Sequence, residues 1–305
     1  MMNQLLEIIK SRTFENDKLY LIKNLNDDYG FFYSNKEIIF GKKSDRTSIG
    51  SSISTDYLDM ELNVYIESLN LNNTYNSGNY DLLIFKNITE EIKMDIFYSI
   101  CCSYANDQSG ISFSDFFNSL VDIFREHGDM DYANVLGLLG EMIFIKKVYE
   151  VSGKNISQNW HRTGINSKFD FTFSGLNIEV KTTSKSELEF SLKHSQIFNN
   201  QNNYVAIVNV LETGEGESIE TLCDYFQKTK PFSTDVKLQI CINKELTRVR
   251  KPGKNKFSLD NIFLIDVNDM KRLDDIPSCI SNISYDYDFS DIRKSDINKI
   301  KDILN

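Results

Sequence analysis

The sequence has little of what marks a secreted, membrane-spanning or disulfide-bonded protein. Its 305 residues contain no apolar run of the length, about 18 residues, that a helix needs to cross a bilayer. Acidic and polar side chains interrupt the first ten residues, where a signal peptide needs an unbroken apolar stretch. The five cysteines are scattered and lack CxxC spacing, so we expect reduced thiols. These absences predict a cytoplasmic protein with no membrane segment.

Several kinds of catalytic site are also missing. The three histidines are isolated from one another, which argues against zinc. No serine or cysteine stands in a recognisable nucleophile elbow. Gly214-Glu215-Gly216 lacks the Lys-Ser/Thr that a phosphate-binding loop requires. These candidates are therefore weaker than the charged hairpin described below.

Charge is distributed unevenly along the chain. The net charge of −10 comes from residues 1–139, which hold 11 basic and 21 acidic residues, whereas residues 140–305 hold 23 of each. Within the second part, residues 227–256 contain nine basic and two acidic residues, a local balance of +7. Such a stretch is suited to following a phosphate backbone, although ordinary solvated lysines are an equally good interpretation.

Hydrophobic patterns divide the chain into two predicted domains. Short strand-like runs at 19–22, 30–33, 37–40 and 80–85 predict a small β-rich N-terminal domain over residues 1–88. Residues 89–305 alternate between helical and strand patterns, which predicts a mixed α/β domain with a C-terminal extension. Predicted strands here include Glu189–Lys193, Tyr204–Leu211, Lys237–Ile242 and Ile262–Val267, and an amphipathic helix is predicted over Ser290–Leu304.

The segment from Phe169 to Lys181 is the most informative part of the chain. If Ser174-Gly175 forms a two-residue turn, Asp170 faces Glu179 across a hairpin whose other face is wholly apolar. Two carboxylates in this position cost stability unless a cation lies between them. A divalent metal ion is one candidate, and Lys181, which projects from the same strand face as Glu179, is the alternative.

A third carboxylate precedes the hairpin on a predicted helix. Glu141 has apolar neighbours at helical spacing, namely Gly137, Leu138, Phe144 and Ile145, so its side chain is predicted to point inward. An unpaired buried charge is costly, and Glu141 therefore needs a partner. Gly137 and Gly140 would let this helix approach a sheet closely.

Glu141, Asp170 and Glu179-Val180-Lys181 together resemble the core of the PD-(D/E)XK nuclease superfamily. The chain looks most like a branch of bacterial PD-(D/E)XK-motif proteins found in phage-defence gene clusters. The resemblance covers roughly residues 131–211, and Phe169 stands where the name has Pro. It implies a restriction-endonuclease-like core, a mixed β-sheet flanked by helices.

This resemblance also implies the role of each residue. Asp170, Glu179 and the backbone carbonyl of Val180 would hold Mg²⁺, for which Mn²⁺ would substitute. Lys181 would orient or deprotonate the attacking water, and the metal would stabilise charge on the phosphate. Glu141 would hold a second ion or position Lys181, and Gln196 would be an auxiliary polar residue.

The implied activity is Mg²⁺-dependent endonucleolytic hydrolysis of DNA in antiviral defence. We expect DNA to contact Lys168, Lys185, Lys193, Arg248, Arg250, Lys251, Lys254 and Lys256. Two alternatives stay open. In one, the chain is a catalytically silent subunit that binds DNA or a partner from the defence cluster. In the other, it is a stand-alone homodimeric restriction endonuclease.

Overall fold

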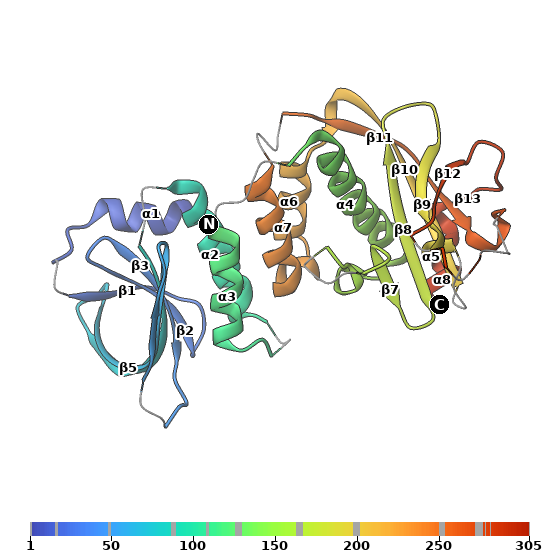
Figure 1. The fold of residues 1–305 in the computed structure, drawn as a ribbon. Coiled ribbons are helices and arrows are strands. Elements are labelled where there is room, and N and C mark those ends of the chain that lie inside the picture. Colours follow the sequence, from blue (N-terminus) through green and yellow to red (C-terminus); the bar gives the residue numbers. More distant parts are fainter. Residues whose placement is uncertain are drawn as a thin grey trace. The chain divides into compact units, whose positions relative to one another are not determined.

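A computed structural model (Figure 1) describes residues 2–15, 18–47, 50–86, 90–107, 110–125, 130–162, 167–197, 202–249, 254–271, 277, 279–280 and 282–304. The chain divides into two compact units. Unit 1 comprises residues 1–127 and 233–247, and unit 2 comprises residues 128–232 and 248–305. The predicted boundary at residue 88 lies within unit 1.

Unit 1 is built on a six-stranded sheet in the order β1-β2-β3-β6-β5-β4. The strands are β1 (Leu19–Asn24), β2 (Tyr29–Ser34), β3 (Glu37–Lys43), β4 (Ser52–Ser54), β5 (Leu58–Asn70) and β6 (Tyr75–Phe85). β1 also pairs in parallel with the end of β5, which closes five of the strands into a ring. The predicted β-rich character of this region is confirmed, although β4 and the long β5 were not predicted.

Helices cover one face of this sheet, and they explain why unit 1 extends past residue 88. Alternate strand residues such as Phe31, Phe40 and Phe85 form a buried core with Phe97 of α2 (Glu91–Ala105) and Phe116 of α3 (Phe113–Phe124). Helix α1 (Met2–Ser11) packs on the same core. Because these aromatic side chains would otherwise face water, their burial holds α2 and α3 against the sheet of unit 1.

The predicted strand Lys237–Ile242 is instead part of helix α7 (Val236–Arg248), and that prediction is wrong. The Asp235 carboxylate accepts a hydrogen bond from the backbone N–H of Leu238, which is N-terminal capping. Val236 enters the buried core of unit 1. A capping residue and a buried helical face therefore outweigh the alternating pattern of apolar residues.

Unit 2 contains a five-stranded mixed sheet in the order β13-β11-β10-β8-β7. The strands are β7 (Phe171–Phe173), β8 (Leu176–Thr183), β10 (Asn202–Glu217), β11 (Phe257–Asp266) and β13 (Ser295–Asp296). β8 and β10 run parallel, and the other neighbours are antiparallel. The mixed sheet with flanking helices agrees with the predicted fold class.

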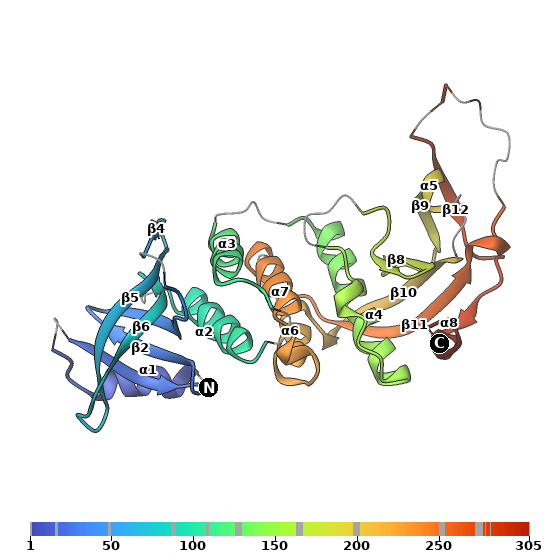
Figure 2. The ribbon, with the colours of Figure 1, turned by 90° about the horizontal axis from the view of Figure 1, so that it is seen from below.

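Different elements cover the two faces of this sheet (Figure 2). Helix α4 (Tyr132–Ser152) packs on one face of β8 and contacts α6 (Ile219–Lys228). A two-stranded sheet of β9 (Glu189–Lys193) and β12 (Ser284–Asp288) shares a second core with Val205 and Ile207. The predicted strand Glu189–Lys193 therefore exists, and it joins this small sheet.

The C-terminal region differs from the predicted helix over Ser290–Leu304. Ser295–Asp296 form β13, in which Asp296 aligns with Phe263 of β11. The Asp296 carboxylate then accepts a hydrogen bond from the N–H of Asn298 and starts a short turn that leads into α8 (Ile300–Leu304). Because of the strand pairing at the sheet edge and this cap, the regular helix is restricted to the last five residues of the predicted range.

Candidate active site

The hairpin that carries Asp170 and Glu179 has the predicted register. Its turn is Ser174-Gly175, and Gly175 has a left-handed φ of 81°, which glycine adopts without steric cost. The paired residues are Phe171 with Ile178, Thr172 with Asn177, and Phe173 with Leu176. Phe171 is fully buried, and its ring centroid lies 5.5 Å from that of Phe144 on α4. The apolar face of the hairpin thus packs against α4.

Asp170 lies in a bend one residue before β7, so the backbone ladder with β8 ends at Phe171 and Ile178 and does not include the predicted pairing of Asp170 with Glu179. The Asp170 Oδ2 atom accepts a hydrogen bond of 2.7 Å from the backbone N–H of Val180. In an antiparallel ladder the N–H and C=O of one residue point to the same neighbour, so the Val180 carbonyl faces the edge where Asp170 lies. The Asp170 carbonyl in turn accepts the N–H of His161 at 2.9 Å. The carboxylate is therefore held in place at the edge of β8.

Glu179 and Lys181 project from the same side of β8, as alternation along a strand requires. Glu179 is 7% exposed, and its Oε1 atom accepts a hydrogen bond of 2.7 Å from the Lys181 Nζ atom. The lysine thus neutralises one of the two predicted metal-binding carboxylates.

Helix α4 brings Glu141 close to the same strand. Gly140 makes this possible, because a Cβ at this position would lie 1.8 Å from the Thr182 Oγ1 atom of β8. Gly137 has no atom within 4 Å of an equivalent Cβ, so only Gly140 provides the predicted close approach. Glu141 is 7% exposed, which confirms that its side chain points inward.

The partners of Glu141 come from the segment before the hairpin. Its Oε2 atom accepts a hydrogen bond of 2.6 Å from the Trp160 indole N–H, and its Oε1 atom accepts one of 2.5 Å from the Arg162 Nη1 atom. The sequence singled out neither residue as a partner of Glu141. The one available signal was that an inward glutamate needs a cation, which did not identify Arg162.

Burial raises the pKa values of all three carboxylates. Desolvation, with the nearby Asp170 charge, raises the pKa of Glu179 to about 7, against the opposing effect of Lys181. Desolvation raises the pKa of Glu141 to about 8, with Asp170 and Glu179 adding to the shift and Arg162 and Trp160 opposing it. Burial likewise raises the pKa of Asp170. The three carboxylates therefore influence one another, and a bound cation would relieve their shared cost.

The protein-family comparison agrees with this geometry. Residues 18–290 match the model of the family described as "Putative PD-(D/E)XK family member, (DUF4420)". The chain belongs to this family. Searches of the curated proteins and of the solved structures found no match. The family match extends well beyond residues 131–211 and includes most of unit 1.

Gln196 has a defined place in this PD-(D/E)XK protein. It lies on the short helix α5 (His194–Ile197), where its Oε1 atom accepts the N–H of Lys193 and its Nε2 atom donates to the Lys168 carbonyl, both at 2.8 Å. A hydrogen bond from Gln196 also lowers the pKa of Glu179. Gln196 thus joins the segment that leads into Asp170 to the end of β9.

The basic residues predicted to contact DNA fall into two groups. Lys168, Lys185 and Lys193 are exposed on segments adjoining the hairpin and β9. Lys254 and Lys256 lie just before β11, and Arg248 ends α7, whereas Arg250 and Lys251 lie outside the described residues.

Within the second group, Lys256 lies far along the sheet from the carboxylates. Val205 of β10 aligns with both Glu179 of β8 and Ile265 of β11. Lys256 precedes Ile265 by nine residues, which in an extended strand corresponds to about 30 Å. Any phosphate that Lys256 contacts is therefore roughly one turn of duplex away from a phosphate at Glu179.

The donor set limits how an ion is held. Within the parts of the chain that the structure describes, no group of three or more His, Cys, Asp or Glu side chains is arranged to hold a metal ion. A site on Asp170 and Glu179 therefore needs the Val180 carbonyl and water to complete an oxygen shell.

The described helices include none that is long and apolar enough to cross a membrane.

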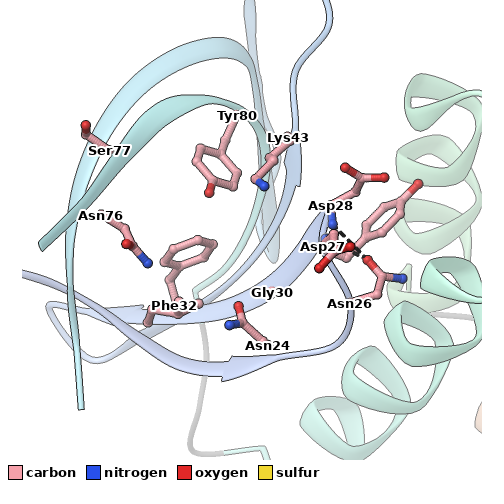
Figure 3. A pocket seen from close by; sticks show the side chains of 12 residues that line it. Asn24, Asn26, Asp27, Asp28, Gly30, Phe32, Lys43, Asn76, Ser77 and Tyr80 are labelled. Atoms are coloured by element: carbon pink, nitrogen blue, oxygen red, sulfur yellow. Dashed lines mark hydrogen bonds between the residues drawn. The ribbon is translucent and has the colours of Figure 1, made fainter. Parts of the chain in front are cut away.

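Unit 1 has a pocket of its own (Figure 3). This cavity of about 290 Å³ lies among β1, β2, β3 and β6, with Phe32 and Tyr80 on its wall and Asn24, Asn76 and Lys43 around it. None of the predicted site residues lines this pocket.

Proposed function

We propose that this protein is a divalent-metal-dependent nuclease that hydrolyses DNA phosphodiester bonds, with its active site at the β7-β8 hairpin. The observation that carries the proposal is the pairing of Glu179 with Lys181 beside Asp170 in a chain of the PD-(D/E)XK family. Buried carboxylates with raised pKa values fit a cation, because a bound ion offsets the cost of burying their charge. Oxygen donors of this kind suit Mg²⁺ or Mn²⁺.

In this proposal Asp170, Glu179 and the Val180 carbonyl hold the ion. When bound, such an ion stabilises charge on the phosphate and lowers the pKa of a bound water. The Asp170 carboxylate keeps its orientation through the Val180 N–H, so little reorganisation is needed. Lys181, whose Nζ atom donates to Glu179, would hold and orient the attacking water beside the ion. Gln196 keeps Glu179 and the Lys168 segment in place.

The test is a nicking assay on supercoiled plasmid with Mg²⁺, Mn²⁺ or EDTA. Wild-type protein is expected to nick or cut DNA only with metal, and Asp170→Asn, Glu179→Gln and Lys181→Met are each expected to lose at least about 100-fold in rate. Asp170→Asn keeps an oxygen for the Val180 N–H, and Glu179→Gln keeps one for Lys181, so both variants should fold. Glu189→Gln, an exposed carboxylate on β9, is the matched control. Undiminished cleavage by the three variants would refute the site assignment.

A second function is favoured by the charge of −10 on residues 1–139, which repels DNA and attracts a basic protein. In this alternative the chain is a silent subunit of a defence complex. Failure to cut DNA with either metal, together with a stable complex with a protein encoded nearby, would support it. Cutting at one sequence by a homodimer would instead identify a stand-alone restriction endonuclease.

The proposed role in antiviral defence rests on the resemblance alone, and protection of cells from phage infection by wild type but not by Asp170→Asn would test it.

A further inference from the structure

Glu141 is a buried carboxylate with a hydrogen-bond donor on each of its oxygens. Trp160 donates to one oxygen at 2.6 Å, and Arg162 donates to the other at 2.5 Å. Trp160 is 8% exposed, whereas 18% of the Arg162 side chain is exposed. The arginine is therefore the member of this cluster that extends toward solvent.

The pairing with Arg162 makes Glu141 a poor ligand for a second metal ion. A divalent ion on the Glu141 oxygens would stand within a few ångströms of the guanidinium, and like charges at that distance repel strongly in a buried site. The ion would also have to displace two existing donors. Glu141 has its charge compensated by the protein itself.

The charges of the whole cluster lead to the same conclusion. A bound cation favours the ionised form of each carboxylate. With Glu141, Asp170 and Glu179 ionised and paired with the positive charges of Arg162 and Lys181, the cluster carries −1. One divalent ion brings the cluster to +1, and one phosphodiester then brings it to zero. A second ion would leave an uncompensated +2 in a largely buried site, which is costly.

Arg162 also lies within electrostatic reach of the proposed metal site. Arg162 directly follows His161, whose backbone N–H donates to the Asp170 carbonyl at 2.9 Å, so the segment that carries the guanidinium runs beside Asp170 as well as Glu141. A guanidinium presents a planar fork of donors that matches two oxygens of a phosphate. Donors fixed in advance beside a reacting phosphate stabilise the charge that builds up on its oxygens.

We propose that Arg162 binds the phosphate being cut, that Glu141 is the positioning residue that holds it, and that the site takes one metal ion per chain. This inference rests on the proposed function, since it names the group that contacts the substrate at the same site. It departs from the expectation that Glu141 holds a second ion.

The first experiment counts metal ions. Isothermal titration with Mn²⁺ on the full chain is expected to give one ion for wild type, Arg162→Gln and Glu141→Gln, and none for Asp170→Asn. Two ions for wild type and one for Glu141→Gln would overturn the inference, and the proposed nuclease function would survive that result.

The second experiment separates substrate contact from a structural role. Arg162→Gln is expected to lower kcat by about 100-fold or more while the Mn²⁺ affinity changes by less than about threefold, and Arg162→Lys should restore only part of the loss because it keeps the charge but not the fork. Glu141→Gln should lower kcat less than Arg162→Gln does, because Arg162 is still present but no longer held by a charge. Equal activity of Arg162→Gln and wild type would refute the proposal.

A third measurement does not depend on cleavage. Binding of a short DNA duplex in Ca²⁺, followed by fluorescence anisotropy, should weaken about tenfold or more in Arg162→Gln, whereas Lys301→Gln, which removes the same charge from an exposed position on α8, should change it by about threefold or less. An equal effect of the two variants would overturn the phosphate contact. If Arg162→Gln does not fold, the double variant Arg162→Gln/Glu141→Gln replaces it, because this variant leaves no unpaired buried charge. The double variant must then show the same loss of DNA binding. Absence of cleavage in wild type with the anisotropy difference intact would refute the nuclease function and leave the phosphate contact standing.

Discussion

The close approach of α4 to β8 at Gly140 leads to a sharp prediction about one added methyl group. In Gly140→Ala the new Cβ would lie 1.8 Å from the Thr182 Oγ1 atom and 2.8 Å from the Thr182 Cβ and Cγ2 atoms. Because carbon and oxygen atoms in ordinary contact are about 3.4 Å apart, the helix or the strand must shift by roughly 1.5 Å. That shift moves Glu141 and Arg162 away from the hairpin.

Two quantities should change in this variant. Overpacking costs about 1–3 kcal/mol, partly offset by the gain of about 1 kcal/mol for replacing glycine in a helix. A displacement of about 1 Å at an active site can cost about 100-fold in rate. We therefore expect Gly140→Ala to lose up to about 2 kcal/mol in the free energy of unfolding by urea and about 100-fold in the rate of plasmid nicking.

Gly137→Ala is the matched control, one helical turn earlier on α4. Its Cβ would meet no atom within 4 Å, so the variant should be as active as wild type and more stable by up to about 1 kcal/mol. Adding Thr182→Ala to Gly140→Ala removes two of the three clashing atoms and should recover part of both losses. The reasoning fails if Gly140→Ala and Gly137→Ala have the same stability and activity.

Three further predictions follow from the hairpin, the buried carboxylates and the basic residues. Gly175→Ala should lower the free energy of unfolding by about 1 kcal/mol, because its φ of 81° disfavours alanine, and Gly175→Asn should lower it less; equal thermal stability of the two would contradict this. Without metal, raised pKa values mean that the folded state binds protons more tightly than the unfolded state, so stability present below about pH 4.5 should be lost as the pH rises through 7 to 8. For Glu179 this loss is up to about 3 kcal/mol in the free energy of unfolding, which urea unfolding at pH 5 and pH 8 measures. Glu179→Gln should reduce the dependence of this free energy on pH. Mn²⁺ should stabilise the protein more at pH 8 than at pH 6. Replacing both Lys254 and Lys256 with alanine should weaken DNA binding and reduce its salt dependence while kcat at saturating DNA stays unchanged, and a fall in kcat would place these lysines nearer to the chemistry than the sheet register allows.

The hairpin could be predicted from sequence because all of its determinants are local. A Ser-Gly turn, alternating apolar residues and a charge pattern of period two fix the register within thirteen residues. The inward orientation of Glu141 could be predicted for the same reason, from neighbours at helical spacing.

The contacts that complete the site join segments far apart in the chain. Arg162 reaches Glu141 across 21 positions from a loop, and no periodicity specifies such a contact. β9 finds its partner in β12, about ninety residues later, so a strand pattern alone could not show which sheet it joins. In α7, a buried helical face and the Asp235 cap outweigh an alternating pattern over Lys237–Ile242.

The hydrogen bond from the Val180 N–H to Asp170 restricts which residues this position tolerates. The Asp170 side chain accepts the hydrogen bond that a neighbouring strand would otherwise accept, and it also faces the proposed ion. Losing it altogether would leave a backbone donor at the strand edge without its acceptor, which costs about 1–3 kcal/mol where water cannot replace it. Asparagine keeps an oxygen at the same distance from the backbone and removes only the charge. If Asp170 holds the ion as proposed, a relative that has lost cleavage but kept the fold should carry asparagine at this position.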